Sequence, residues 1–163
     1  MEINYIDESK FQQIEGIRQI IVHDHARRFA SINLDHLGEC GLSWRSDLIE
    51  PILRLSPDNS TAWIGVDQQL VALDLKLGRI AVALPLISSV IQILTLSDLT
   101  VVLTELEVVL FNLDGSIRCV KGLPDIGSEI AVQGTSLIIS LLEGDNLILN
   151  IETGRLLEPV MTS

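Results

Sequence analysis

A repeat with a period of 38 residues is the feature of this sequence that most restricts its fold. Two sets of similar residues recur at this spacing: Asp74, Asn112 and Asn150, and Asp67, Glu105 and Glu143. Self-similarity at a fixed period of tens of residues indicates stacked copies of one supersecondary unit, in which neighbouring copies bury each other's apolar faces. The chain is therefore expected to be a repeat protein from about residue 49 onward.

Each copy contains four runs rich in Val, Ile and Leu, and these runs are separated by turn residues. Short hairpin turns need positive φ angles, which Gly, Asn and Asp adopt readily, and Asp114-Gly115 is one such turn. Val and Ile favour strands between the turns. The first copy is predicted to have strands at residues 49–55, 61–66, 70–75 and 79–84, and the last strand of the third copy is predicted at residues 155–160.

The composition predicts an aliphatic core and no membrane span. The 163-residue chain is 47% hydrophobic but only 4% aromatic. Its longest apolar stretch, residues 81–94, is interrupted by Pro85 and is shorter than the ~20 apolar residues that cross a bilayer. The acidic N-terminal segment lacks the basic start and apolar run of a secretory signal. These observations favour a soluble, cytoplasmic protein.

Four antiparallel strands in roughly 40 residues are typical of a β-propeller blade. The segments Val71–Arg79 and Asn146–Arg155 specifically resemble the blade signature A-x-D-x-x-T-G-x-x-x-W of quinoprotein-like propellers. This resemblance covers about residues 49–163 and implies a propeller fold. The tryptophan of the signature is absent, and the aromatic residues and carboxylates that hold pyrroloquinoline quinone have no counterpart, so no cofactor is expected.

Residues 1–48 do not continue the repeat in register, because the position 38 residues before Asp74 is a histidine. A capping-box pattern at Ser9 and Gln12, followed by apolar residues at helical spacing, predicts an amphipathic helix over residues 10–27. A hairpin, readable as a partial blade, is predicted over residues 29–44. Closed propellers usually have four to eight blades, so residues 1–48 or a second copy in a homodimer is expected to cover the open end.

The predicted fold is mainly all-β and forms one structural domain. An N-terminal helix and partial hairpin act as a cap, and three consecutive four-stranded antiparallel blades follow as an incomplete or oligomer-completed propeller. The predicted boundaries are 1–48 for the cap and about 49–86, 87–125 and 126–163 for the blades.

The charge of the chain restricts its partners. With 22 acidic and 11 basic residues, the net charge is −11. Nucleic acids and anionic membrane surfaces attract clusters of Lys and Arg, so neither is an expected partner. A basic protein surface would be attracted to the chain. The alternative interpretation is that the acidity only keeps an apolar protein soluble.

Three acidic residues, Asp67, Glu105 and Glu143, occupy the predicted turn between the second and third strands of their copies. Such turns lie on one face of a propeller, with the connections between blades. We interpret five carboxylates and an aromatic contact as a surface for a basic partner: Asp67, Glu105, Asp125, Glu143, Asp145 and Trp44. The alternative is that turns simply favour acidic residues. Calcium is not expected, because it needs six to eight converging oxygen ligands.

Metal binding and catalysis receive little support. His23, His25 and His36 are weak candidates for a zinc site, because residues two apart on a strand point the same way. Ordinary surface histidines are the simpler interpretation, so no metal is predicted. Cys40 and Cys119 are expected to be free thiols. The chain has no G-x-S-x-G motif, no phosphate-binding glycine loop and no C-x-x-C pair, so no catalytic residue is proposed.

The sequence therefore predicts a non-enzymatic module that binds a basic protein. One concrete version is an immunity- or inhibitor-type protein that neutralises a basic cytosolic enzyme. Two alternatives stay open: an enzyme or small-ligand protein with its site in the groove between blades, and a structural protein that self-assembles.

Overall fold

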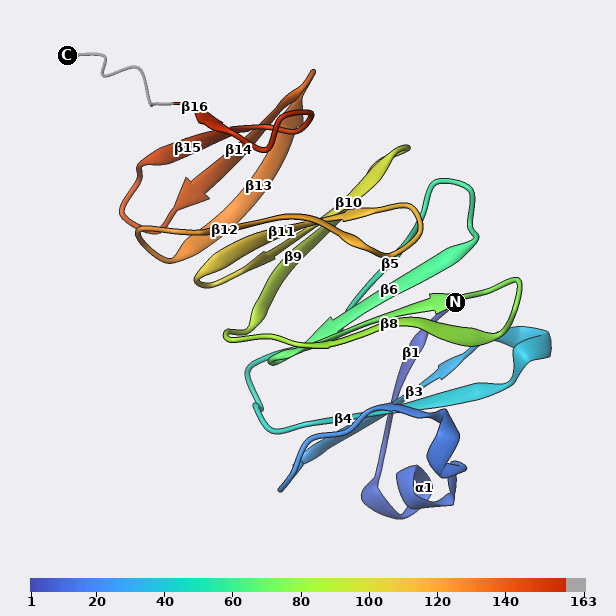
Figure 1. Cartoon of the computed structure of the whole chain (residues 1–163). Helices are drawn as coiled ribbons and strands as arrows, with labels where there is room; N and C mark the ends of the chain where they lie inside the picture. Colours follow the sequence, from blue (N-terminus) through green and yellow to red (C-terminus); the bar gives the residue numbers. More distant parts are fainter. Residues whose placement is uncertain (158–163) are drawn as a thin grey trace. The chain divides into compact units, whose positions relative to one another are not determined.

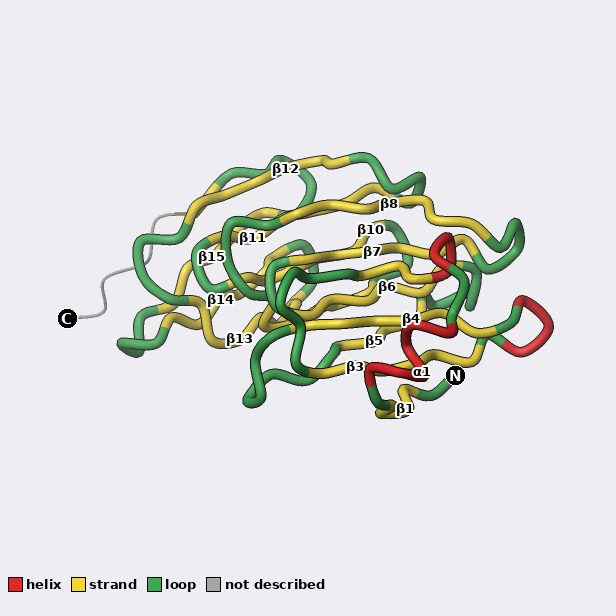
Figure 2. Tube along the Cα trace, turned by 90° about the horizontal axis from the view of Figure 1, so that it is seen from below, coloured by secondary structure: helices red, strands yellow, loops and turns green. Residues whose placement is uncertain are grey.

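A computed structural model describes residues 1–157 of the chain. The chain forms two compact units, unit 1 (Met1–Leu86) and unit 2 (Ile87–Ser163), and each contains two four-stranded sheets (Figure 1). In the described residues, helical segments occur only in unit 1 (Figure 2). The mainly all-β fold with consecutive four-stranded antiparallel sheets is confirmed.

Sheet B, in unit 1, is the first copy of the repeat. Its strands pair antiparallel in chain order: β5 (Ile52–Leu55), β6 (Thr61–Val66), β7 (Gln69–Asp74) and β8 (Arg79–Pro85). The last three strands agree with the predicted ranges to within one residue at each end. The first begins at Ile52 instead of residue 49, directly after Pro51, which has no N–H to donate to a neighbouring strand.

Unit 2 contains the second and third copies. Sheet C is formed by β9 (Val90–Thr95), β10 (Leu99–Thr104), β11 (Glu107–Asn112) and β12 (Ile117–Gly122). Sheet D is formed by β13 (Gly127–Gln133), β14 (Ser136–Leu141), β15 (Asn146–Asn150) and β16 (Leu156–Leu157). Of the strand predicted at 155–160, residues 158–160 lie outside the described residues.

The residues that mark the repeat occupy equivalent positions. Asp74 and Asn150 end β7 and β15, and the Oδ1 of each accepts hydrogen bonds of 2.9 and 3.0 Å from the backbone N–H groups two and three residues later. Gly78 and Gly154 close these turns with positive φ angles of 65° and 71°. Asn112 also ends β11, but its turn is one residue shorter and is bonded differently. Its Nδ2 donates to Ser116 Oγ at 3.0 Å, and Asp114 Oδ1 accepts from the Ser116 N–H at 2.9 Å. The same turn chemistry therefore recurs in the first and third copies, and the second copy places a shorter turn at the equivalent position.

Sheet A, in unit 1, precedes the repeat. Its strands lie in the order β1-β3-β4-β2: β1 (Ile3–Ile6), β2 (Gln19–Ile21), β3 (Arg28–Asn33) and β4 (Glu39–Trp44). The predicted hairpin is confirmed as β3–β4, with the short 3-10 helix η2 (Asp35–Leu37) between them. Strands β1 and β2 extend this hairpin to a full sheet, and β2 pairs parallel with β4. Sheet A is therefore a fourth sheet, but it is not a copy of the repeat.

The helix predicted over residues 10–27 is wrong beyond its first turns. Helix α1 spans Glu8–Gln13, and its N-cap is Asp7 instead of Ser9, because the Asp7 side chain accepts a 2.8 Å hydrogen bond from the Lys10 N–H.

The chain after α1 forms a 3-10 turn, η1 (Gly16–Arg18), and then strand β2. The side-chain amide of Gln19 donates to the carbonyls of Phe11 and Ile14, so these carbonyl groups at the C-terminal end of α1 have hydrogen-bond partners. Ile17, which belongs to the predicted apolar helical stripe, is 81% exposed. Glycine is a poor helix former and β-branched residues favour strands, so pairing of β2 with β4 prevails over the helical pattern.

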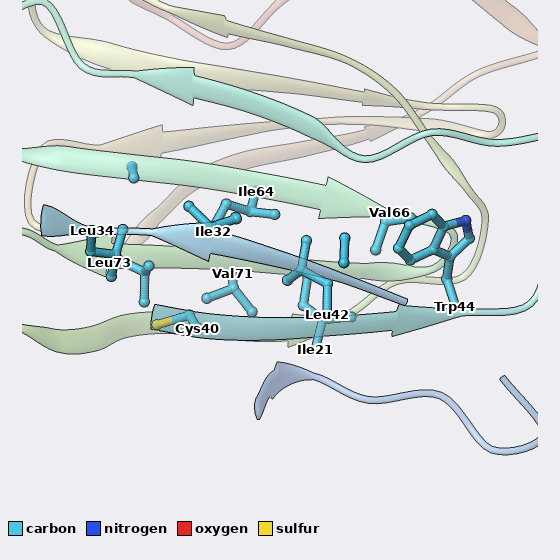
Figure 3. Packing of buried hydrophobic residues seen from close by; sticks show 12 residues of the cluster. Ile21, Ile32, Leu34, Cys40, Leu42, Trp44, Ile64, Val66, Val71 and Leu73 are labelled. Atoms are coloured by element: carbon cyan, nitrogen blue, oxygen red, sulfur yellow. The ribbon is translucent and has the colours of Figure 1, made fainter. Parts of the chain in front are cut away.

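Each unit has its own aliphatic core. In unit 1 the core lies between sheets A and B (Figure 3) and contains, among others, Ile32, Leu42, Trp44, Ile64 and Val71. Helix α1 covers the other face of sheet A. In unit 2 the core lies between sheets C and D and contains Leu99, Val101, Leu103, Leu137 and Ile139. Among residues 1–157, no helix is long and apolar enough to cross a membrane.

Candidate functional site

The turn between the second and third strands of a repeat is bonded to the segment that leaves the same sheet. In sheet B the N–H of Leu86 donates to the carbonyl of Gln68 at 2.7 Å. In sheet C the N–H of Leu123 donates to the carbonyl of Leu106 at 2.8 Å. These bonds place the turn and the connection at one end of each sheet, which we call the turn end.

The turn ends of sheets C and D lie next to each other in unit 2. The N–H of Gly127 donates to the carbonyl of Glu105 at 2.9 Å, and the N–H of Glu143 donates to Oδ2 of Asp125 at 3.3 Å. Glu143 and Asp145 are exposed, whereas Glu105 and Asp125 are half-buried. Four of the five carboxylates singled out in the sequence therefore lie together at one end of unit 2.

Two further carboxylates at this end were not identified from the sequence. Glu107 begins β11 directly after the turn, and Glu129 lies near the start of β13, opposite Ser140. Sequence proximity could have identified them, because Glu107 is two residues from Glu105 and Glu129 is four residues from Asp125. We call the six residues the acidic end of unit 2: Glu105, Glu107, Asp125, Glu129, Glu143 and Asp145.

The acidic end carries almost no compensating charge. Lys121, on β12, is the basic residue near it, while Arg118 and Arg155 lie toward the opposite end of unit 2. In the part of the chain that the structure describes, none of the six carboxylates forms an ion pair. Apart from the nearby Lys121, the charge of these carboxylates is therefore compensated by solvent and counterions.

A buried hydroxyl pair, also missed from the sequence, fixes the Glu105 turn. Ser88 Oγ donates to Thr104 Oγ1 at 2.8 Å, and Thr104 Oγ1 donates to the carbonyl of Glu107 at 3.2 Å. The N–H groups of Leu106 and Glu107 donate to the hydroxyl oxygens of Ser88 and Thr104. Because every polar group of this network has a partner, the turn that carries Glu105 is held rigidly.

Asp67, the equivalent residue in unit 1, has a different environment. It is 9% exposed, and its Oδ2 accepts hydrogen bonds from the N–H groups of Arg45 at 3.0 Å and Ser46 at 3.4 Å. Its φ angle of 48° is one that Asp tolerates in a two-residue turn. Arg27 and Arg45 lie at this end of unit 1. Asp67 therefore links the β6–β7 turn to the segment after β4 through its hydrogen bonds, and it is not a freely exposed carboxylate.

Trp44 is not the exposed aromatic contact that the sequence suggested. Its side chain is 0% exposed, and its Nε1 donates to the carbonyl of Ile49 at 2.9 Å. The Tyr5 ring lies 6.0 Å away between centroids, and the Arg28 guanidinium lies 5.5 Å from the Trp44 ring. The alternation of β4 points Trp44 into the core with Leu42, which explains the error.

The three histidines are not brought together. His23 and His25 precede the six-residue strand β3 and His36 follows it, so they lie at opposite ends of a strand about 20 Å long. Nδ1 of His23 lies 2.6 Å from the carbonyl oxygen of Ser43. No group of three or more His, Cys, Asp or Glu side chains within residues 1–157 is arranged to hold a metal ion.

Both cysteines are free thiols, as predicted. Burial raises the pKa of the Cys40 thiol, and this effect exceeds the opposing influence of Arg18. A neutral, buried thiol is a poor nucleophile, so Cys40 does not suggest catalysis.

No protein-family model and no curated protein sequence matches this chain. Solved structures do match it. Sqt1 from Saccharomyces cerevisiae is 14% identical with a TM-score of 0.58, and the match covers 96% of this chain and 48% of Sqt1. The Cps50 (Swd1) β-propeller domain from Myceliophteria thermophila is 15% identical with a TM-score of 0.54, and the match covers 67% of this chain and 38% of that domain.

The N-terminal domain of Nup159 is 15% identical with a TM-score of 0.53, over 64% of this chain and 32% of that domain. A structure of S. cerevisiae Dbp5 bound to Nup159 and Gle1 matches equally well. The chain thus spans between a third and a half of the length of these proteins. At such low identity the likeness concerns the fold alone, and on that ground this chain has a β-propeller repeat fold.

Proposed function

We propose that this chain is a non-enzymatic protein-binding module that uses the acidic end of unit 2 to bind a basic surface of a protein partner in the cytoplasm. The observation that carries the proposal is the grouping of six carboxylates, without an ion pair in the described residues, at one end of two sheets that share a hydrophobic core. A prearranged group of like charges is a surface that an oppositely charged partner complements.

The charge is concentrated in unit 2. Unit 2 has ten acidic and three basic residues, a net charge of −7, whereas unit 1 has twelve acidic and eight basic residues, a net charge of −4. An uncompensated field of this kind steers a basic partner during encounter and increases the association rate. Binding is therefore expected to weaken as salt screens the exposed charges.

The comparison with Nup159 supports protein binding as a use of this fold, because that protein occurs in complex with Dbp5. Since one fold hosts many functions, the choice of a basic partner rests on the charges of this chain. One concrete form is an immunity- or inhibitor-type protein that covers a basic enzyme. The resemblance to quinoprotein-like blades stays a prediction, and the proposal does not depend on it.

Self-assembly is the competing use of the surface, and the charge disfavours it. Two copies that met through their acidic ends would place like charges face to face, which is destabilising. A homodimer through another surface stays a prediction, and its test is the mass of the protein in solution.

Affinity capture from a soluble extract of the source organism, at low and high salt with mass spectrometry of the eluted proteins, tests the proposal. The double variant Glu105→Lys/Glu143→Lys is the test bait. Asp98→Lys/Glu152→Lys is the control, because it makes the same charge change in exposed turns at the opposite end of unit 2.

We expect wild type and control to retain a basic partner at low salt and the test variant to lose it. With the purified partner, the association rate of the test variant should fall by about tenfold or more, since exposed charges act mainly on association. Equal binding by the test variant and the control would contradict the proposal.

A further inference from the structure

Unit 1 contains a cavity of about 370 Å³ that the acidic end does not involve. It lies beside η1 and η2 of the N-terminal region and the β7–β8 turn of sheet B. Its wall is mainly aliphatic and includes Ile20, Leu34, Leu37, Leu73, Leu75 and Ile80. A concave, apolar site of this size falls in the range of small-molecule sites.

The cavity is formed by segments that are already held in place. The β7–β8 turn is closed by the Asp74 side chain, which accepts from two backbone N–H groups. Gly78, at a φ of 65°, packs so closely on η2 that a Cβ there would lie 3.0 Å from Leu37 Cδ2. Two segments about 40 residues apart in sequence therefore form one wall without needing a ligand to bring them together.

The charged residues that line the cavity carry an excess of positive charge. They are Arg18, Arg79 and Asp74. One N–H of Arg18 donates to the carbonyl of Leu37 at 2.5 Å, and its guanidinium lies against Gly38, where a Cβ would be 2.7 Å from Nη1. The Asp74 carboxylate is engaged in its turn. The lining thus has a net charge of +1, although unit 1 as a whole has a net charge of −4. This local positive charge favours an anionic ligand group.

We propose that this cavity binds an aliphatic carboxylate, with the hydrocarbon chain against the apolar wall and the carboxylate between Arg18 and Arg79. Ile17, which is 81% exposed, and Ile80, which is 42% exposed, extend the apolar surface at its opening. Cys40 also lines the cavity, and because its buried thiol is neutral it does not repel an anionic ligand. The site lies wholly in unit 1 and is independent of the protein-binding function proposed for unit 2.

An NMR titration of the full chain with sodium decanoate, below its micelle-forming concentration, tests this inference. Decan-1-ol and decylammonium serve as the neutral and cationic ligands with the same hydrocarbon chain. We expect decanoate to shift the backbone amide signals of residues 34–40 and 73–80. Its Kd should be about tenfold lower than those of the other two ligands, because only the carboxylate forms charge-assisted hydrogen bonds.

Two matched variants then test the role of the guanidinium. Arg79→Glu changes the charge at the cavity, and Arg54→Glu makes the same change at an exposed site on β5 of the same sheet. Arg79→Glu should raise the Kd for decanoate about tenfold, and Arg54→Glu less than about twofold. Arg79→Gln, which keeps a polar side chain, should give an intermediate value, and an unchanged amide spectrum of the free variant shows that it is folded.

Three results would overturn the inference. They are equal binding of decanoate and decan-1-ol, shifts confined to residues outside this wall, and an equal rise in Kd for Arg79→Glu and Arg54→Glu. Absence of any shift up to the solubility limit of decanoate would also reject it.

Discussion

Units 1 and 2 each contain two four-stranded sheets, yet they are assembled in different ways. In unit 2 each strand pairs antiparallel with the next strand in sequence, so both sheets form from local hairpins. In unit 1 only sheet B does so. Sheet A takes β2 from a segment that precedes its hairpin and pairs it parallel with β4. A sheet of the same strand number can therefore be completed without the repeat, through pairing that depends on the tertiary structure.

The same contrast holds for single residues. Asp67 and Glu105 lie at the same place in their repeats, but Asp67 bonds inward to the segment after β4, while Glu105 lies half-buried among other carboxylates. The segment at Arg45 and Ser46 presents two N–H groups to the Asp67 carboxylate. Equivalent positions in a repeat therefore acquire different roles from their neighbours.

The largest expected effect is on stability, and it compares one core substitution in each unit. Trp44→Ala should lower the free energy of unfolding of unit 1 by about 3–5 kcal/mol, because it empties a fully buried aromatic site that also holds Ile49 and Tyr5. Leu137→Ala should lower that of unit 2 by about 2–5 kcal/mol. Amide hydrogen exchange, measured unit by unit, reports both. Unchanged protection of the β3 and β4 amides in Trp44→Ala would show that sheet A does not depend on this side chain.

A second pair of variants tests the junction of sheets C and D within unit 2. A Cβ at Gly127 would lie 2.8 Å from Leu103 Cδ1 and 3.2 Å from the carbonyl oxygen of Thr104, whereas a Cβ at Gly122 would meet nothing within 4 Å. Gly127→Ala should therefore cost about 1–3 kcal/mol by overpacking, measured by urea unfolding. Gly122→Ala is the matched control and should be near neutral. Equal costs would mean that the junction can relax around an added methyl group.

The third prediction compares the equivalent turn residues. Asp67→Ala should lower the stability of unit 1 by about 1–3 kcal/mol, because two N–H groups lose a charged acceptor and alanine disfavours a φ of 48°. Glu105→Ala should change stability by less, on the order of 0.5 kcal/mol, since the structure gives its side chain no hydrogen bond. Thermal and urea unfolding distinguish them. An equal loss for Glu105→Ala would assign it a structural role as well.

The smallest expected effect depends on pH. Hydrogen bonds from the Ser60 and Ser56 side chains lower the pKa of Asp58 to about 2 in unit 1, and the Ser116 side chain lowers the pKa of Asp114 in unit 2. Because these folded-state pKa values lie below the ordinary value near 4, each charged carboxylate stabilises its turn above that value. For Asp58 the stabilisation is lost as the pH falls from about 4 to about 2, and for Asp114 it is lost as the pH falls below about 4 through its lowered pKa.

Asp58→Ala should therefore lower the Tm slightly at pH 7, and its difference from the wild type should shrink as the pH approaches 2. Asp114→Ala should behave in the same direction. A difference in Tm that persists unchanged at pH 2 would attribute the effect to the turn backbone and not to the charge.

Much of the repeat could be predicted from the sequence because its determinants are local. Asp74-to-Gly78 and Asn150-to-Gly154 contain their own turn chemistry, and the intervening aliphatic runs have few alternatives to a strand. The grouping of Glu105 and Glu143 followed from the period, because stacked copies repeat their turns at one end. That of Asp125 followed from the expectation that connections between blades lie at the same end. The Ser88–Thr104 network could not be predicted, since its partners are 16 residues apart with no motif to link them.

The amino-acid sequence by itself determined three four-stranded sheets, their turn residues and an excess of negative charge that unit 2 carries in largest part. Only the tertiary structure decided that Ile17 faces solvent, that Trp44 and Asp67 point inward, and that residues 19–21 form a strand. The physical reason is the range of the interactions. Turn geometry and strand preference act within a few residues, whereas burial and parallel pairing depend on which distant segment supplies the neighbouring surface.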